Sequence, residues 1–156
     1  MIKLVLFDFD GVFTDGTISI NQDGNVIKKY NVRDGMGIIS LQRQGLEIGV
    51  ISGWAYNKSQ HIILDHLNIK RVEWESNDKY TTVRKWCTEL GISLNEVAYM
   101  GDDLNDIGVI NSVSLSACPN DAVMAVKNNV DIVCENNGGN GAIREFCDYI
   151  VKLKTK

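Results

Sequence analysis

Five aspartates directly follow two short apolar runs of the sequence, residues 4–7 and 97–100. They are Asp8, Asp10, Asp102, Asp103 and Asp106. Carboxylates gathered at one place repel one another, and a hard divalent cation removes that repulsion. Oxygen ligands without histidine or cysteine select Mg²⁺. The group after residues 97–100 has another explanation if taken by itself: acidic residues at the start of a helix interact favourably with the helix dipole. That explanation does not cover the first pair, so we predict a magnesium site.

Two further polar groups lie just beyond other apolar runs. Ser52 and Gly53 follow Ile48–Ile51, and Lys79 comes shortly after Arg71–Trp74. A lysine in the first turn of a helix opposes the macrodipole, which favours an anionic partner over a plain surface position. A hydroxyl such as that of Ser52 is otherwise explained as a helix cap. Ser52 and Lys79 are stronger candidates together, because both are predicted to lie at the same edge of the sheet as the aspartates.

The elements that must bring these groups together are short apolar runs alternating with helical patterns. The runs are Leu4–Phe7, Ile48–Ile51, Arg71–Trp74, Val97–Met100, Val113–Ala117 and Asp131–Cys134. Consecutive apolar positions are typical of parallel strands buried on both faces. Helical periodicity covers residues 56–68, residues 78–90 after Asn77 as N-cap and before Gly91 as C-cap, and residues 141–153. This alternation predicts an α/β fold with a central parallel sheet flanked by helices, in which ligands bind at the carboxyl ends of the strands.

One segment departs from the alternation. Residues 16–32 hold two β-like runs around a turn cluster that contains Asp23-Gly24. We therefore expect a β-hairpin inserted after the first strand.

Length and charge narrow the class of protein. The chain has 156 residues, of which 16 are basic and 20 acidic, giving a net charge of −4. We expect one domain over residues 1–156. The acidic balance argues against a nucleic-acid or anionic-membrane surface, and no run of about 18 apolar residues or signal peptide is visible. The four cysteines lack metal-site spacing and are expected to be reduced thiols of a cytoplasmic protein.

Four motifs in this order resemble those of the haloacid dehalogenase superfamily of phosphotransferases. They are DFDGVFTD, ISG, the lone Lys79 and GDDLND. The resemblance implies that Asp8 is a nucleophile that accepts the phosphoryl group and that Asp10 is the general acid and base. It also implies that Ser52, Gly53 and Lys79 bind the phosphoryl group. Mg²⁺ would be held by Asp8, the Asp10 carbonyl and Asp102, with Asp103 and Asp106 holding metal-bound water or Lys79.

The hairpin sequence and the segment GGNGAIREF resemble a capless subgroup of this superfamily, Rossmann-like in its core. Its members hydrolyse phosphorylated keto-sugar acids, either 3-deoxy-D-manno-octulosonate 8-phosphate or nonulosonate 9-phosphates. They are typically tetramers in which hairpins meet and neighbours cover each active site. The resemblance implies substrate contacts for Arg33 and Trp54. Trp54 stands where octulosonate phosphatases usually carry arginine, and Asn140 replaces another arginine, so the sugar acid is not fixed.

Two other folds fit the sequence less well. Gly138–Gly141 lacks the third glycine of a dinucleotide-binding loop. A response-regulator receiver would need a phospho-accepting aspartate after the run 71–74, where Glu75, Ser76 and Asn77 stand. A non-catalytic alternative stays open, because the same module forms part of some acylneuraminate cytidylyltransferases. In that case the chain would be an oligomerisation module, although all the catalytic residue types are present.

Overall fold

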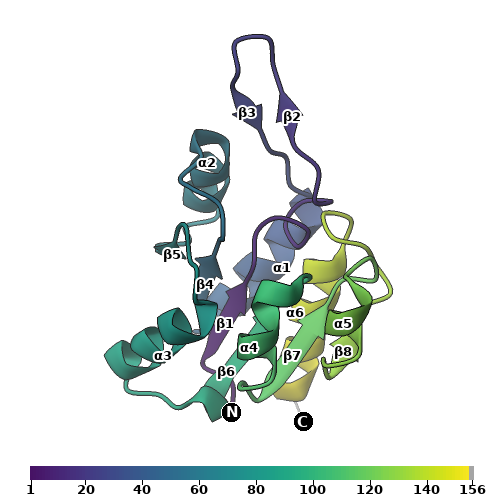
Figure 1. The fold of residues 1–156 in the computed structure, drawn as a ribbon. Coiled ribbons are helices and arrows are strands. Elements are labelled where there is room, and N and C mark those ends of the chain that lie inside the picture. Colours follow the sequence, from purple (N-terminus) through teal and green to yellow (C-terminus); the bar gives the residue numbers. More distant parts are fainter. Residues whose placement is uncertain (155–156) are drawn as a thin grey trace.

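The computed structural model describes residues 1–154 and confirms the α/β class: one sheet of six parallel strands is flanked by helices (Figure 1). The strand order is β5-β4-β1-β6-β7-β8. The strands are β1 (Leu4–Phe7), β4 (Glu47–Ile51), β5 (Arg71–Glu73), β6 (Val97–Met100), β7 (Leu115–Cys118) and β8 (Ile132–Val133). Because β1 lies between β4 and β6, the segments that follow these three strands meet at one edge of the sheet.

The helices cover both faces of the sheet. One face carries α1 (Val32–Arg43), α2 (Lys58–His66) and α6 (Ala142–Lys154), and the other carries α3 (Lys79–Leu90), α4 (Ile107–Ile110) and α5 (Met124–Lys127). Side chains of β1 alternate between the two cores, since Val5 and Phe7 face the first and Leu4 and Leu6 the second. Such alternation is the two-residue period of a strand buried on both faces. Of these helices, none is long and apolar enough to cross a bilayer within the part of the chain described.

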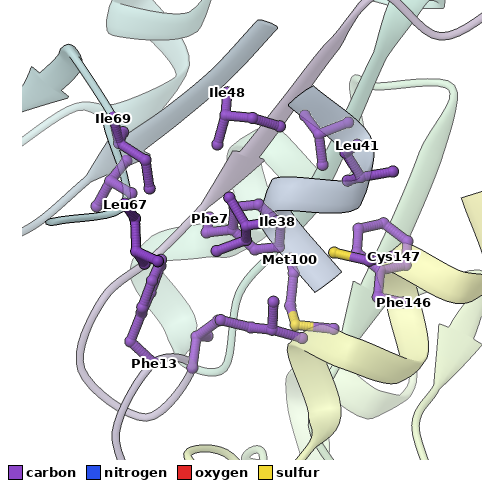
Figure 2. Packing of buried hydrophobic residues seen from close by; sticks show 14 of the residues in the cluster. Phe7, Phe13, Ile38, Leu41, Ile48, Leu67, Ile69, Met100, Phe146 and Cys147 are labelled. Carbon is purple, nitrogen blue, oxygen red and sulfur yellow. The ribbon is translucent and has the colours of Figure 1, made fainter. Parts of the chain in front are cut away.

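The larger core is centred on Phe7. Figure 2 shows the Phe7 ring among Ile38, Met100 and Phe146, which come from α1, β6 and α6. The Phe7 and Phe146 rings meet edge to face with centroids 6.4 Å apart. An aromatic pair of this kind adds about 0.5–1.5 kcal/mol beyond the burial of its area. This packing fixes the end of β1, from which Asp8 emerges.

Helix α1 was not predicted, because Gly35 and Gly37 weaken the helical pattern. In the structure both glycines are buried where neighbouring elements come close. A Cβ on Gly37 would lie 3.1 Å from the Cα of Arg144 and the Cβ of Cys147, so α6 packs directly on the backbone of α1. Asn31 caps the helix by accepting the Arg33 N–H at 2.8 Å. Tertiary packing has thus overridden the local propensity.

The other predicted helices are confirmed, with shifted ends. Helix α3 is capped by Asp78 and not by Asn77, since the Asp78 carboxylate accepts the Thr81 N–H at 3.1 Å. Gly91 ends this helix in the left-handed region, with φ of 63°, as predicted. The remaining predicted helices, residues 56–68 and 141–153, are found as Lys58–His66 and Ala142–Lys154. The last strand is only two residues long, shorter than predicted.

The predicted hairpin is present as β2 (Ser19–Ile20) and β3 (Val26–Ile27), which pair antiparallel. Its paired part is shorter than the sequence suggests. The hairpin projects from the carboxyl edge of the sheet, beside α2 (Figure 1). Three of its apolar side chains, Ile18, Ile20 and Ile27, are 38%, 62% and 51% exposed.

The segment before α6 presses against the loop that follows β1. A Cβ on Gly138 would lie 1.9 Å from the carbonyl oxygen of Gly11, and one on Gly139 would lie 2.8 Å from the backbone of Thr14. The Gly139 N–H also donates to the Val12 carbonyl at 3.0 Å. Only glycine can come this close, which explains this glycine pair without any dinucleotide.

Candidate active site

Asp8 continues the line of β1 into the edge of the sheet. Its N–H donates to the Met100 carbonyl at 2.9 Å, so the ladder between β1 and β6 extends one residue beyond the strand. Its carboxylate Oδ1 accepts the Phe9 N–H at 2.7 Å. The side chain is nearly buried, yet it lines a cavity. Strand pairing thus fixes a carboxylate at the base of that cavity.

Asp106 is fully buried beneath the loop that follows β6. Its Oδ2 accepts the N–H groups of Asp102 at 2.9 Å and Asp103 at 3.1 Å. A Cβ on Gly101 would lie 2.4 Å from the Asp106 carboxyl carbon, so a glycine is needed there. Asp103 in turn caps the short turn Leu104–Asp106. The GDDLND motif therefore folds around its own last aspartate.

Lys79 connects the two aspartate groups. Its Nζ lies 2.9 Å from Asp8 Oδ1 and 2.7 Å from Asp106 Oδ1, and its side chain is buried. Burial alone would lower the Lys79 pKa, but the Asp8 and Asp106 charges outweigh it and raise that pKa above its ordinary value. The Tyr99 hydroxyl donates to the same Asp106 oxygen at 2.5 Å. The carboxylates supply the anionic partner that a lysine at this helix start requires.

The carboxylates of Asp8, Asp102 and Asp106 form a group in which one oxygen from each lies within 4.8 Å of the others. Burial, followed by the neighbouring carboxylate charges, raises the pKa of Asp8 to about 6 and that of Asp102 to about 9. Asp102 Oδ1 is buried and has no hydrogen-bond partner among the described residues. An orphaned carboxylate oxygen beside a second carboxylate fits a divalent cation. Asp106 already accepts four hydrogen bonds, so Asp8 and Asp102 have the freer oxygens.

The cavity above these carboxylates has a volume of about 210 Å³. Residues from three loops, those after β1, β4 and β6, line it: Asp8, Asp10, Gly16, Gly53, Trp54, Asp102, Asp103 and Asn105. Trp54 is 47% exposed at its edge. Ser52 is buried just below, where its hydroxyl accepts the Trp54 N–H at 3.3 Å. Asn105 was not among the predicted residues, although it lies inside the GDDLND motif that pointed to this loop.

Asp10 also lines the cavity, but its carboxylate has a partner that the sequence did not reveal. Lys28, at the end of the hairpin, brings its Nζ to 2.7 Å from both Asp10 oxygens. In the sequence Lys28 is one of two adjacent lysines on an inserted segment, and no spacing links it to Asp10. Only the path of the hairpin across the sheet edge reveals the contact.

Arg33 is not brought to this cavity within the chain. It is exposed at the start of α1 and lines a separate groove of about 390 Å³ with Asn140, Arg144 and others. None of the residues lining that groove lines the Asp8 cavity. Of the predicted site residues, Arg33 is the one that lies apart.

The chain is similar in sequence to known proteins. A sequence profile of haloacid dehalogenase-like hydrolases matches residues 55–146. The chain is 36% identical to the 3-deoxy-D-manno-octulosonate 8-phosphate phosphatase of Haemophilus influenzae over 155 residues, which cover 99% of this chain and 86% of that protein. It is also 33% identical to an N-acylneuraminate cytidylyltransferase of Oncorhynchus mykiss, covering 100% of this chain and 37% of that protein.

A solved structure agrees closely with the fold. The 3-deoxy-D-manno-octulosonate 8-phosphate phosphatase of Moraxella catarrhalis, crystallised with a magnesium ion, a phosphate ion and a KDO molecule, superposes with a TM-score of 0.93. The identity is 31%, and the match covers 97% of this chain and 86% of that one. The similarity therefore spans the whole sheet and the loops that line the cavity.

Proposed function

The chain belongs to the haloacid dehalogenase-like hydrolases and is a phosphoric monoester hydrolase acting on a sugar phosphate, and from this premise we propose its substrate class and mechanism. The substrate is the phosphate ester of a 3-deoxy-2-keto sugar acid, either octulosonate 8-phosphate or a nonulosonate 9-phosphate. The observation that supports the mechanism best is the Asp8 carboxylate, which is held by Lys79 at 2.9 Å and open to the cavity. A carboxylate in this position can act as a nucleophile.

In the proposed reaction Asp8 attacks phosphorus while Asp10 gives a proton to the leaving sugar oxygen as its bond to phosphorus breaks. Asp10 then takes a proton from water, which attacks the phosphorus of phospho-Asp8 and releases phosphate and free Asp8. Lys79 neutralises charge on the transferring phosphoryl group, and we assign the Ser52–Gly53 segment to the same task. Asp106 acts through Lys79, because two of its hydrogen bonds fix the ammonium and the loop above it.

We propose Mg²⁺ as the cation, held by Asp8, the Asp10 carbonyl and Asp102, with Asp103 placed near its bound water. The ligands are all oxygens, and the orphaned Asp102 Oδ1 is an open position. When bound, the cation neutralises the carboxylates and polarises the phosphoryl oxygens. The relative crystallised with magnesium and phosphate supports this choice.

Trp54 is the proposed sugar contact inside the cavity. Its half-exposed ring borders the same space as Asp8 and Asp10. An aromatic face packs against the apolar side of a sugar ring without needing a charged partner. A tryptophan here selects by shape, so the eight- and nine-carbon acids must be compared directly.

A phosphate-release assay across eight- and nine-carbon ulosonate phosphates tests the substrate class, with hexose phosphates as controls. We expect at least one ulosonate phosphate to exceed every hexose phosphate by about tenfold or more in kcat/KM. Equal rates on all compounds would indicate a generalist phosphatase. No release from any of them would favour the non-catalytic module, a reading supported by the cytidylyltransferase relative, which is much longer than this chain.

We also propose a homotetramer in which hairpins meet. The support is the exposure of Ile18, Ile20 and Ile27 on a hairpin too short to be stable by itself. In such an assembly Arg33 would contact substrate in a neighbour's cavity. Light scattering of wild type and of the double variant Ile20→Ser, Ile27→Ser checks this. A monomeric wild type at micromolar concentration would reject the proposal.

A further inference from the structure

Lys28 is a buried ammonium with a complete set of directed partners. Its side chain is 0% exposed, and its Nζ lies 2.7 Å from each Asp10 carboxylate oxygen and 3.2 Å from Gln60 Oε1. The rings of Phe9 and Trp54 enclose it, with centroids 5.4 and 4.9 Å from Nζ. An ammonium has three N–H donors, and here three acceptor oxygens meet them. The geometry leaves the ammonium no freedom to turn elsewhere.

The backbone of Lys28 is fixed equally firmly. Its N–H donates to the Ser59 hydroxyl at 2.8 Å, and that hydroxyl donates back to the Lys28 carbonyl at 3.0 Å. Ser59 and Gln60 lie in the first turn of α2, whose N-cap Asn57 accepts the Gln60 N–H at 3.1 Å. Helix α2 therefore sets both ends of the Lys28 residue, and the hairpin is tied to the site at this point.

Stability alone explains this arrangement poorly. Burying an ammonium is costly, and an apolar residue of similar size often serves at least as well. The pair is also asymmetric, because the Asp10 side chain remains 21% exposed toward the cavity while Lys28 is closed off. Because the buried Lys28 ammonium binds both oxygens of the partly exposed Asp10 carboxylate, it restricts the direction in which that carboxylate points.

Resting on the proposed function, in which Asp10 exchanges protons with the leaving oxygen and with water, we infer that Lys28 is a positioning residue that orients the Asp10 carboxylate toward the phosphoryl site. Lys28 itself touches neither the substrate nor the transferring group. Proton transfer requires the donor within hydrogen-bond reach of the leaving oxygen, so a loosened carboxylate slows that transfer. The hairpin thus supplies a part of the catalytic machinery.

The test uses the leaving group. Alkyl phosphates need a proton on the departing oxygen, whereas 4-nitrophenyl phosphate releases a stable anion without one. We expect Lys28→Met to lower kcat/KM for the alkyl substrate by about 10- to 100-fold and for 4-nitrophenyl phosphate by less than about threefold. The quantity kcat/KM is chosen because it covers the steps up to phosphorylation of Asp8. Asp10→Asn should show the same selectivity, with a larger loss.

Lys29→Met is the matched control, because Lys29 is the adjacent, exposed lysine on the same segment and its substitution removes the same charge. It should leave both substrates unaffected. If Lys28→Met unfolds, as judged by circular dichroism, Lys28→Gln replaces it, and the same selective loss is expected. Equal losses on both substrates in a folded variant would overturn the inference and make Lys28 merely structural. A wild type inactive on both substrates, or an unselective Asp10→Asn, would instead overturn the proposed function.

Discussion

Two buried lysines serve the two aspartates that follow β1, and they reach them from different regions of the molecule. Lys79 comes from α3 in the packed body of the fold and binds Asp8 together with the fully buried Asp106. Lys28 comes from the projecting hairpin and binds Asp10, which remains partly open to the cavity. The first lysine belongs to a closed network of charges, and the second holds a residue that we propose meets the substrate. The same chemical pair therefore has different consequences in the two regions.

The largest effect should come from the body of the fold. Asp8→Asn removes the proposed nucleophile, so turnover should fall by about 10⁴-fold or more. The fold should persist, because Asn keeps the oxygen that accepts the Phe9 N–H and one buried charge is lost. Activity and thermal unfolding are measured on the same samples. Asp23→Asn, at the exposed tip of the hairpin, is the matched control. A variant with normal turnover would reject Asp8 as nucleophile.

Substitutions of the two lysines should differ most clearly in their effect on the free energy of unfolding. Lys79→Met leaves Asp106 buried beside Asp8 without a cation, which should lower the free energy of unfolding by about 3–5 kcal/mol. Lys28→Met leaves Asp10 in reach of water, so a loss of only about 1 kcal/mol is expected. Urea unfolding without added metal measures both. Similar losses for the two variants would remove the proposed difference between the regions.

Magnesium should act on the body of the fold in a pH-dependent way. The pKa values of Asp8 and Asp102 are raised in the folded chain, to about 6 and about 9. Stability from these groups is therefore fully present below their ordinary pKa near 4 and is lost as the pH rises through the raised values. After EDTA treatment Tm should fall between pH 5 and pH 9. Added Mg²⁺ should restore more of it at pH 8 than at pH 5, by several °C. Calorimetry that shows a pH-independent gain would contradict this account.

Within the body of the fold, the smallest effect on turnover is expected at Tyr99. Tyr99→Phe removes one of the four hydrogen bonds to Asp106, and about 1.5 kcal/mol of stability should be lost. Lys79 keeps its carboxylate partners, so turnover should change far less than in Asp8→Asn. Tyr149→Phe, at an exposed position of α6, serves as the control. A large loss of turnover in Tyr99→Phe would show that the hydroxyl does more than hold Asp106.

The body of the fold could be predicted from the sequence better than the hairpin contact. Asp8, Lys79 and Asp102 each lie just past an apolar run, and parallel strands carry such residues to one edge. Helix α1 escaped prediction because its two glycines serve packing against other elements. Lys28 escaped because an insertion can return to the site at any of its positions, and neither period nor spacing marks which one. Arg33 is a different case, since the resemblance implies a substrate contact and the residue lines a separate groove of its own chain, so its role stays a prediction.

The glycines that precede α6 affect when the loop after β1 can fold during synthesis. The loop carrying Asp10 is made well before Gly138 and Gly139, on which it rests. The strand that precedes this loop, β1, also pairs with β4 and β6, which are made after it. A nascent chain emerging from the ribosome would hold the proposed catalytic aspartates Asp8 and Asp10 in an unsupported loop until these later parts have been made. Phosphatase activity should therefore appear abruptly, and only after Gly138 and Gly139 have been made and have left the exit tunnel.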